Sequence, residues 1–100
     1  MSWAMPAITT LRAGESIVIR PRGNSMRGRV NDGDRVTVAP VSPADLQVGD
    51  IVLVRVRGND YLHLIKAIDG LRYLIGNNRG GINGWVGASA IYGKATHIEG

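Results

Sequence analysis

The sequence predicts an all-β fold, and three observations lead to that prediction. Valine and isoleucine gather in short runs separated by glycine, aspartate, asparagine and proline, a pattern typical of strands joined by turns. The 100 residues include fourteen glycines and no phenylalanine, which favours many short elements over long helices. No stretch sustains an apolar repeat near 3.6 residues, so a helical architecture is not indicated.

The predicted strands are bounded by turn-forming residues. They are expected near Ser16–Arg20, Arg35–Val41, Asp50–Val56, Tyr61–Ile68, Leu71–Ile75 and Tyr92–Ile98. Arg57–Asp60 has the composition of a tight turn, and Asp69-Gly70 is a strong signal for a two-residue hairpin. Ser42–Asp45 is expected to form a single helical turn.

The length and composition indicate one soluble domain. A chain of this size has room for one modest core, which we expect over residues 14–100, after a poorly ordered N-terminal segment over residues 1–13. No window has the roughly 18 apolar residues of a membrane span, and the first thirteen residues lack the pattern of a secretory signal. We therefore expect a cytoplasmic protein with no membrane partner.

The reactive residue types are few. There is no cysteine, which excludes disulfides and thiol catalysis, and two histidines are too few for a convincing metal cluster. We expect no metal and no cofactor. Ten arginines and two lysines give a net charge of +4, which modestly favours acidic partners.

One turn and its downstream context point to chemistry. The turn is Gly23-Asn24-Ser25-Met26, and it follows a predicted strand and a proline. After it come, in order, Asp32-Gly33-Asp34, Val48-Gly49-Asp50 and Leu62-His63-Leu64. This order and spacing resemble the LexA and signal-peptidase superfamily of serine peptidases, from about Gly14 to Ile98. The resemblance implies coiled antiparallel sheets that form a partly open barrel.

The same resemblance implies roles for two residues. Ser25 stands where the family has its nucleophile, and its backbone N–H is expected to stabilise the oxyanion. His63 stands at the position of the general base, and an imidazole is competent near neutral pH. Lys66 is the fallback base. Because strand side chains alternate, Lys66 is expected on the face opposite to His63.

Two departures from the family pattern concern the neighbourhood of this pair. The family usually has a proline two residues after the Ser-Met pair, whereas this chain reads Ser25-Met26-Arg27-Gly28. The loop over residues 76–84 has no aspartate to orient the histidine, but it has four glycines and three asparagines. Asn77, Asn78 and Asn83 are therefore candidates to orient His63 or to bind substrate, unless the loop is merely a flexible hairpin end. Met26 is expected in the core or lining a pocket.

An arginine cluster flanks Ser25 and consists of Arg20, Arg22, Arg27 and Arg29. It is either a solvated rim or a collar that selects acidic peptide or nucleic acid.

Self-cleavage at Ala13-Gly14, by analogy with LexA-type proteins, is a weaker hypothesis because only ten residues separate Gly14 from Ser25.

The leading functional hypothesis is a soluble serine endopeptidase with a Ser25–His63 dyad, acting as a stand-alone phage or bacterial regulatory module. Its partner is a peptide or protein substrate bound as an extended strand along a sheet edge. The alternative is an inactive β domain that binds peptide or nucleic acid through the arginine rim. A purely structural module is the third reading. The oligomeric state does not follow from the sequence.

Overall fold

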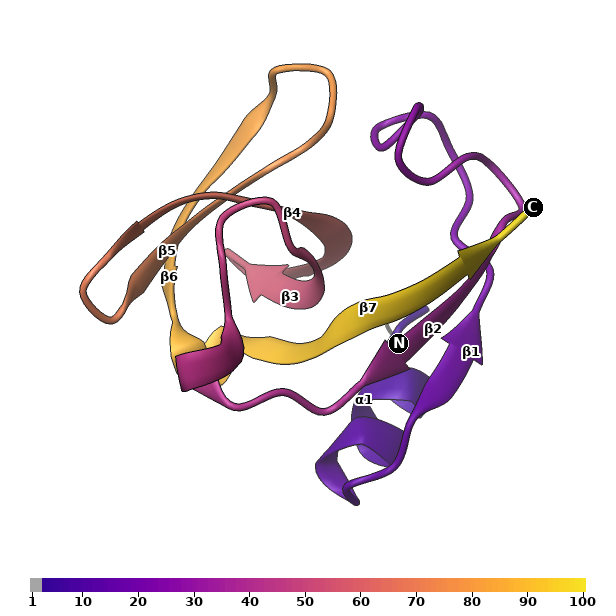
Figure 1. Cartoon of the computed structure of the whole chain (residues 1–100), viewed down its shortest axis with the longest axis horizontal. Coiled ribbons are helices and arrows are strands. Elements are labelled where there is room, and N and C mark those ends of the chain that lie inside the picture. Colours follow the sequence, from indigo (N-terminus) through magenta and orange to yellow (C-terminus); the bar gives the residue numbers. More distant parts are fainter. Residues whose placement is uncertain (1–2) are drawn as a thin grey trace.

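The computed structural model describes residues 3–100, which form one antiparallel sheet of seven strands in the order β1-β2-β7-β3-β4-β5-β6. The strands are β1 (Ile17–Ile19), β2 (Arg35–Ala39), β3 (Ile51–Val56), β4 (Asn59–Asp69), β5 (Arg72–Gly76), β6 (Ile82–Gly87) and β7 (Ile91–Glu99). The sheet coils strongly but does not close, because the edge strands β1 and β6 do not pair with each other (Figure 1). The prediction of an all-β fold of coiled, open antiparallel sheets is confirmed.

Tight turns close the two central hairpins. Between β3 and β4, Arg57 and Gly58 have φ values of 51° and 82°, as a tight hairpin turn requires. Between β4 and β5, Asp69 pairs with Arg72, so the loop is Gly70-Leu71. The turn lies one residue later than the sequence signal suggested. The predicted helical turn is also present, as a 3-10 helix at Pro43–Asp45 (η1).

Two hydrophobic clusters lie on opposite faces of the central strand β3. Ile51 and Leu53 face the first cluster, while Val52 and Val54 face the second. Both faces of β3 are buried because the coiled sheet wraps around it, which is why this strand reads as a nearly continuous apolar run. The first cluster also holds helix α1 and β2, and the second holds residues of β4 and β5.

The segment over residues 1–13, which the sequence predicted to be poorly ordered, contains helix α1 (Met5–Arg12). Ala7, Ile8 and Leu11 share one face of this helix and are buried in the first cluster. A helix this short depends on packing of its apolar face, which composition alone does not reveal. Residues 1 and 2 lie outside the described residues. The helix ends at Arg12, and Gly14, whose φ is 85°, follows the C-cap residue Ala13.

Strand β6 was also missed, since the sequence predicted a loop over residues 76–84. The structure shortens that loop, because β6 begins at Ile82 and pairs with β5 through Gly87. Glycine and asparagine are rare in strands, so their abundance here suggested a turn. Trp85 pairs with Leu74 and Val86 with Tyr73, and β6 is the last strand in the sheet order, so it forms an edge.

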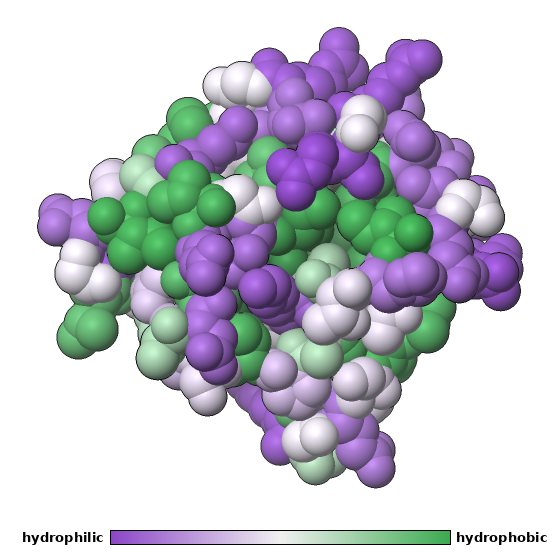
Figure 2. Space-filling model, in the orientation of Figure 1, coloured by the Kyte–Doolittle hydropathy of each residue, from purple (hydrophilic) through white to green (hydrophobic). Residues whose placement is uncertain are grey.

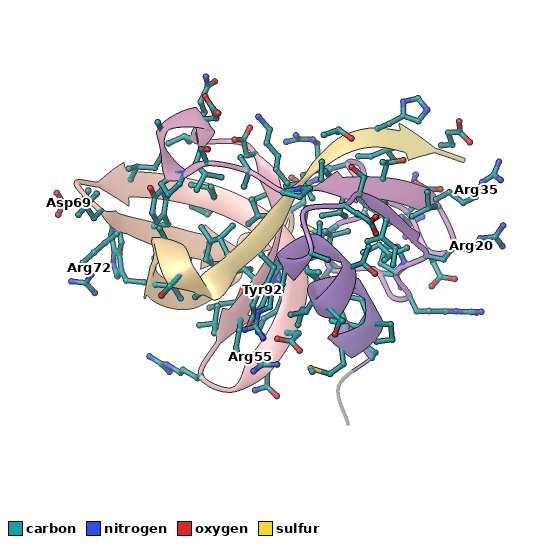
Figure 3. The ribbon with its side chains drawn as sticks, turned by 90° about the horizontal axis from the view of Figure 1, so that it is seen from below. Arg20, Arg35, Arg55, Asp69, Arg72 and Tyr92 are labelled. Carbon is teal, nitrogen blue, oxygen red and sulfur yellow. The ribbon has the colours of Figure 1, made fainter. Side chains whose placement is uncertain are left out.

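The surface has a mixed character. The face shown in Figure 2 carries separate apolar areas among polar side chains. The labelled arginines also diverge: Arg20 and Arg35 lie at one end of the molecule, Arg72 lies at the other, and Arg55 lies between them (Figure 3). Within residues 3–100, no helix is long and apolar enough to span a membrane.

Candidate active site

The Ser25 side chain stands on an irregular loop between β1 and β2. Its turn is closed by a hydrogen bond from the Arg27 N–H to the Asn24 carbonyl (3.1 Å), and the next turn by one from the Val30 N–H to the Met26 carbonyl (2.8 Å). Ser25 itself is exposed to solvent. The loop therefore presents a hydroxyl on the surface from a backbone of defined shape.

Two kinds of contact hold this loop in place. Met26 and Val30 are 4% and 3% exposed and pack into the first hydrophobic cluster. Carboxylates fix the backbone on either side: Asp32 accepts from the Gly23 N–H (2.7 Å) and Asp34 from the Asn31 N–H (2.8 Å). These side chain to backbone bonds replace the ladder that a regular strand would supply.

His63 comes from β4 and is only 6% exposed. It lies on the strand face that carries Tyr61 and Ile65, and the Tyr61 ring stacks on its imidazole with centroids 4.7 Å apart and planes 27° apart. Lys66 lies at a shift in the β4–β5 register, between Ile65 and Ala67, and its side chain packs against Gly76. Within residues 3–100, Lys66 makes no hydrogen bond or ion pair with Ser25.

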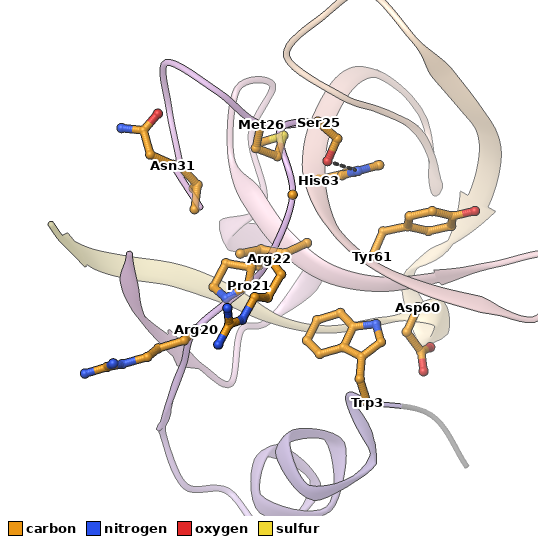
Figure 4. Close-up of a pocket in the computed structure, with 13 residues that line it drawn as sticks. Trp3, Arg20, Pro21, Arg22, Ser25, Met26, Asn31, Asp60, Tyr61 and His63 are labelled. Atoms are coloured by element: carbon orange, nitrogen blue, oxygen red, sulfur yellow. Dashed lines mark hydrogen bonds between the residues drawn. The ribbon is translucent and has the colours of Figure 1, made fainter. Parts of the chain in front are cut away.

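A continuous chain of hydrogen bonds joins three side chains. The Ser25 Oγ lies 3.1 Å from His63 Nε2 (Figure 4), and His63 Nδ1 lies 2.7 Å from Asn83 Oδ1. An amide oxygen can only accept, so Nδ1 carries a hydrogen and donates it to Asn83. In the neutral imidazole, Nε2 is then left as the acceptor for the Ser25 hydroxyl. This is the protonation pattern that a base acting on serine needs.

The electrostatic setting keeps this imidazole neutral. Burial lowers the pKa of His63, and the hydrogen bond to Asn83 acts in the opposite direction but does not outweigh it. The base is therefore unprotonated at neutral pH. Asn83 sets the tautomer without adding the negative charge that an aspartate would supply.

The other two asparagines have different contacts from Asn83. Asn77 caps its own turn, with Oδ1 accepting from the N–H groups of Arg79 (2.9 Å) and Gly81 (2.8 Å). Asn78 bonds the Ser25 loop instead: its N–H donates to the Ser25 carbonyl and its Nδ2 to the Arg27 carbonyl, both at 2.9 Å. Of the three, only Asn83 contacts His63. Asn78 ties the nucleophile turn to the loop that leads to Asn83.

A pocket of about 350 Å³ opens beside the Ser25–His63 pair. One wall is the chain from Arg20 to Met26, the other is Asp60–His63 of β4, and Trp3 stands at the end away from Ser25 (Figure 4). Sequence reasoning missed Trp3, because it precedes a helix that was not predicted. Tyr61 could have been predicted as a neighbour of His63, because it lies two residues earlier and on the same face of the strand.

The arginine cluster does not act as one unit. Arg20 and Arg22 line the pocket, whereas Arg27 does not. Arg29 donates to the Gly49 carbonyl (3.1 Å) beside a second, more polar hollow.

Ala13 and Gly14, the residues of the hypothesised self-cleavage site, lie in the turn that ends α1, remote from the loop that carries Ser25 (Figure 1). A helical turn is not the extended conformation that a peptidase site binds.

Comparison with known proteins yields one family. The family model described as Peptidase S24-like matches residues 2–84, which is most of the chain and includes Ser25, His63 and Asn83. No curated protein matches the chain.

Proposed function

Because the chain belongs to the Peptidase S24-like family, we propose that it is a serine endopeptidase in which Ser25 is the nucleophile and His63 the general base. The observation that carries this proposal is the hydrogen-bonded chain from Ser25 through His63 to Asn83, at 3.1 Å and 2.7 Å. A serine hydroxyl is a weak nucleophile until such a base accepts its proton.

The geometry supports a two-step acyl transfer. As the Ser25 oxygen attacks a peptide carbonyl, its proton passes to His63 Nε2, and the imidazolium then gives this proton to the departing amine. The acyl-enzyme is hydrolysed by a water molecule that His63 deprotonates in the same way. Asn83 keeps Nδ1 protonated throughout, so that Nε2 always faces the reacting oxygen.

The oxyanion needs a hydrogen-bond donor near Ser25 Oγ. Within residues 3–100, no carbonyl or side chain accepts a hydrogen bond from the Ser25 N–H. This N–H is therefore available to the tetrahedral intermediate. One such donor is worth about two to three powers of ten in rate in serine peptidases.

The substrate is proposed to bind as an added strand. The first half of β4, Asn59–His63, pairs with β3 on one side, whereas pairing with β5 begins only at Leu64. The other edge of this half-strand faces the pocket beside Ser25. A peptide laid along it gains main-chain hydrogen bonds from β4 and brings a carbonyl to the serine.

The test is covalent labelling with a fluorophosphonate, read as intact mass, together with digestion of an unstructured protein such as casein. Wild type is expected to gain one adduct and to cleave casein, whereas Ser25→Ala and His63→Ala lose both activities. Ser42→Ala and His97→Ala are matched controls, since Ser42 and His97 are exposed and lie outside the site. An adduct that survives Ser25→Ala would contradict the proposal, as would a folded wild type that neither labels nor cleaves. The latter result would favour the non-catalytic binding module.

A further inference from the structure

The pocket beside Ser25 has an apolar interior that ends at an aromatic ring. Met26, Val30 and Leu62 are buried in its floor, and Trp3 is 55% exposed. An indole left half open beside a cavity offers a face on which another large side chain can stack. A pocket of about 350 Å³ has room for one such side chain.

Trp3 is held in position by the residues that follow it. Ala4 is fully buried and Ile8 is 1% exposed, so the start of α1 is anchored in the first hydrophobic cluster. The backbone at Trp3, just before α1, is therefore held beside the pocket, so a ligand that packs on the indole has to order only the Trp3 side chain.

The charge at the mouth of this pocket is positive. Arg20 and Arg22 line it and, within residues 3–100, form no ion pair with an acidic side chain. The acid in the pocket, Asp60, has a side chain that is 1% exposed and accepts from Arg55 at 2.8 Å and 3.0 Å. Asp32, beside the loop, is engaged by the Gly23 N–H. Two arginines thus remain to meet an anionic ligand.

We propose that the substrate carries a large apolar side chain that packs on Trp3 and, next to it, an acidic side chain that pairs with Arg20 or Arg22. Neighbouring side chains of an extended peptide point in opposite directions. When one enters the pocket, the next therefore faces out toward the rim. This inference rests on the proposed function, because the pocket is the one that leads to Ser25.

Binding is measured on the Ser25→Ala, Trp85→Phe protein, in which Trp3 is the sole tryptophan because the chain has two. Peptides of one length carry a central Phe-Glu pair, or Ser-Glu, Phe-Gln or Phe-Lys in its place, and are titrated while Trp3 fluorescence is followed. Loss of the Phe is expected to weaken binding about tenfold or more, the scale of burying one large apolar side chain. Loss of the Glu is expected to weaken it about threefold, as for a partly exposed ion pair.

Variants of the protein test which side chains cause the preference for Phe and for Glu. Trp3→Ala, measured by calorimetry, is expected to remove the advantage of Phe over Ser, and Trp3→Phe to retain most of it. The double variant Arg20→Gln, Arg22→Gln is expected to remove the advantage of Glu over Gln. Arg72→Gln is the matched control, because Arg72 lies at the other end of the molecule from Arg20 (Figure 3).

Equal affinities for all four peptides would overturn the inference, as would preferences that Trp3→Ala and the double arginine variant leave unchanged. Labelling of wild-type Ser25 separates this failure from that of the proposed function. A labelled serine without any peptide preference overturns only the specificity. A retained preference without labelling overturns only the catalysis, because the Ser25→Ala protein binds without reacting.

Discussion

Ser25 and His63 reach the same point from two kinds of structure. Ser25 stands on an irregular loop, held by two buried side chains, Met26 and Val30, and by carboxylates that bond its backbone. His63 stands on a strand whose pairing with β3 runs unbroken from Asn59 to Leu64. The histidine is thus positioned by the whole sheet, whereas the serine depends on a few local anchors. The two regions should respond differently to substitution.

The largest expected effect is on the strand side, at the centre of the sheet. Leu53→Ala removes a fully buried side chain from β3 and should lower the free energy of unfolding by about 3 kcal/mol. Chemical denaturation measures this loss. Val18→Ala, at a side chain that is 55% exposed on an edge strand, should change it by less than about 0.5 kcal/mol. Similar losses for the two variants would contradict the assignment of the core.

The loop side is tested by Met26→Ala. Removing this anchor should cost about 2 kcal/mol, the lower end for a buried methionine, because an irregular loop relaxes around the cavity more easily than a sheet does. Fluorophosphonate labelling should fall by a larger factor than the folded fraction does, since the serine turn loses its shape. Met5→Ala, on the exposed side of α1, is the control and should label normally. Normal labelling of Met26→Ala would mean that the carboxylate bonds suffice to shape the turn.

The contrast between loop and strand also explains what the sequence could predict. Six of the seven strands were predictable from their apolar runs. Alternation on β4 predicted Lys66 on the face opposite to His63, but the register shift at Lys66 is a local irregularity that alternation does not describe. The Ser25 turn was recognisable through its resemblance to the LexA and signal-peptidase pattern, which rests on the order and spacing of several landmarks along the chain and not on the turn alone. The strand signals are local, whereas the signal for the serine is spread over most of the sequence.

The features that sequence reasoning missed depend on tertiary contacts. Helix α1 forms because the sheet supplies a surface for Ile8 and Leu11, and no composition rule signals that surface. Strand β6 exists because β5 pairs with it, despite its glycines. Asn83 was one of three candidate asparagines. It forms the hydrogen bond to His63 because it lies on β6, and the pairing of β6 with β5 cannot be predicted from these residues alone.

Asn83 links the two regions and gives the third prediction. Asn83→Ala should lower the labelling rate about tenfold or more while the fold persists, because nothing then selects the tautomer with Nε2 free. Asn59→Ala, at an exposed position on the same sheet, should leave the rate unchanged. Asn83→Asp should restore labelling and shift its pH dependence upward, because a carboxylate favours the imidazolium and raises the pKa of His63. An unshifted pH profile in Asn83→Asp would show that residue 83 does not act through His63.

The smallest expected effect is the contribution of His63 to stability as pH changes. Burial lowers the pKa of His63 in the folded protein, so between that value and the ordinary value of about 6.5 the unfolded chain binds more protons. This contribution is therefore complete above pH 6.5 and is lost as the pH falls toward the folded-state pKa. Urea unfolding of wild type at pH 7.5 and pH 5.5 should show the decrease, and His63→Gln should show less of it. Ser42→Ala, at an exposed position outside the site, should behave as wild type does. If His63→Gln kept the full decrease, the strand would not be holding a neutral imidazole, and the serine loop would have no base to meet.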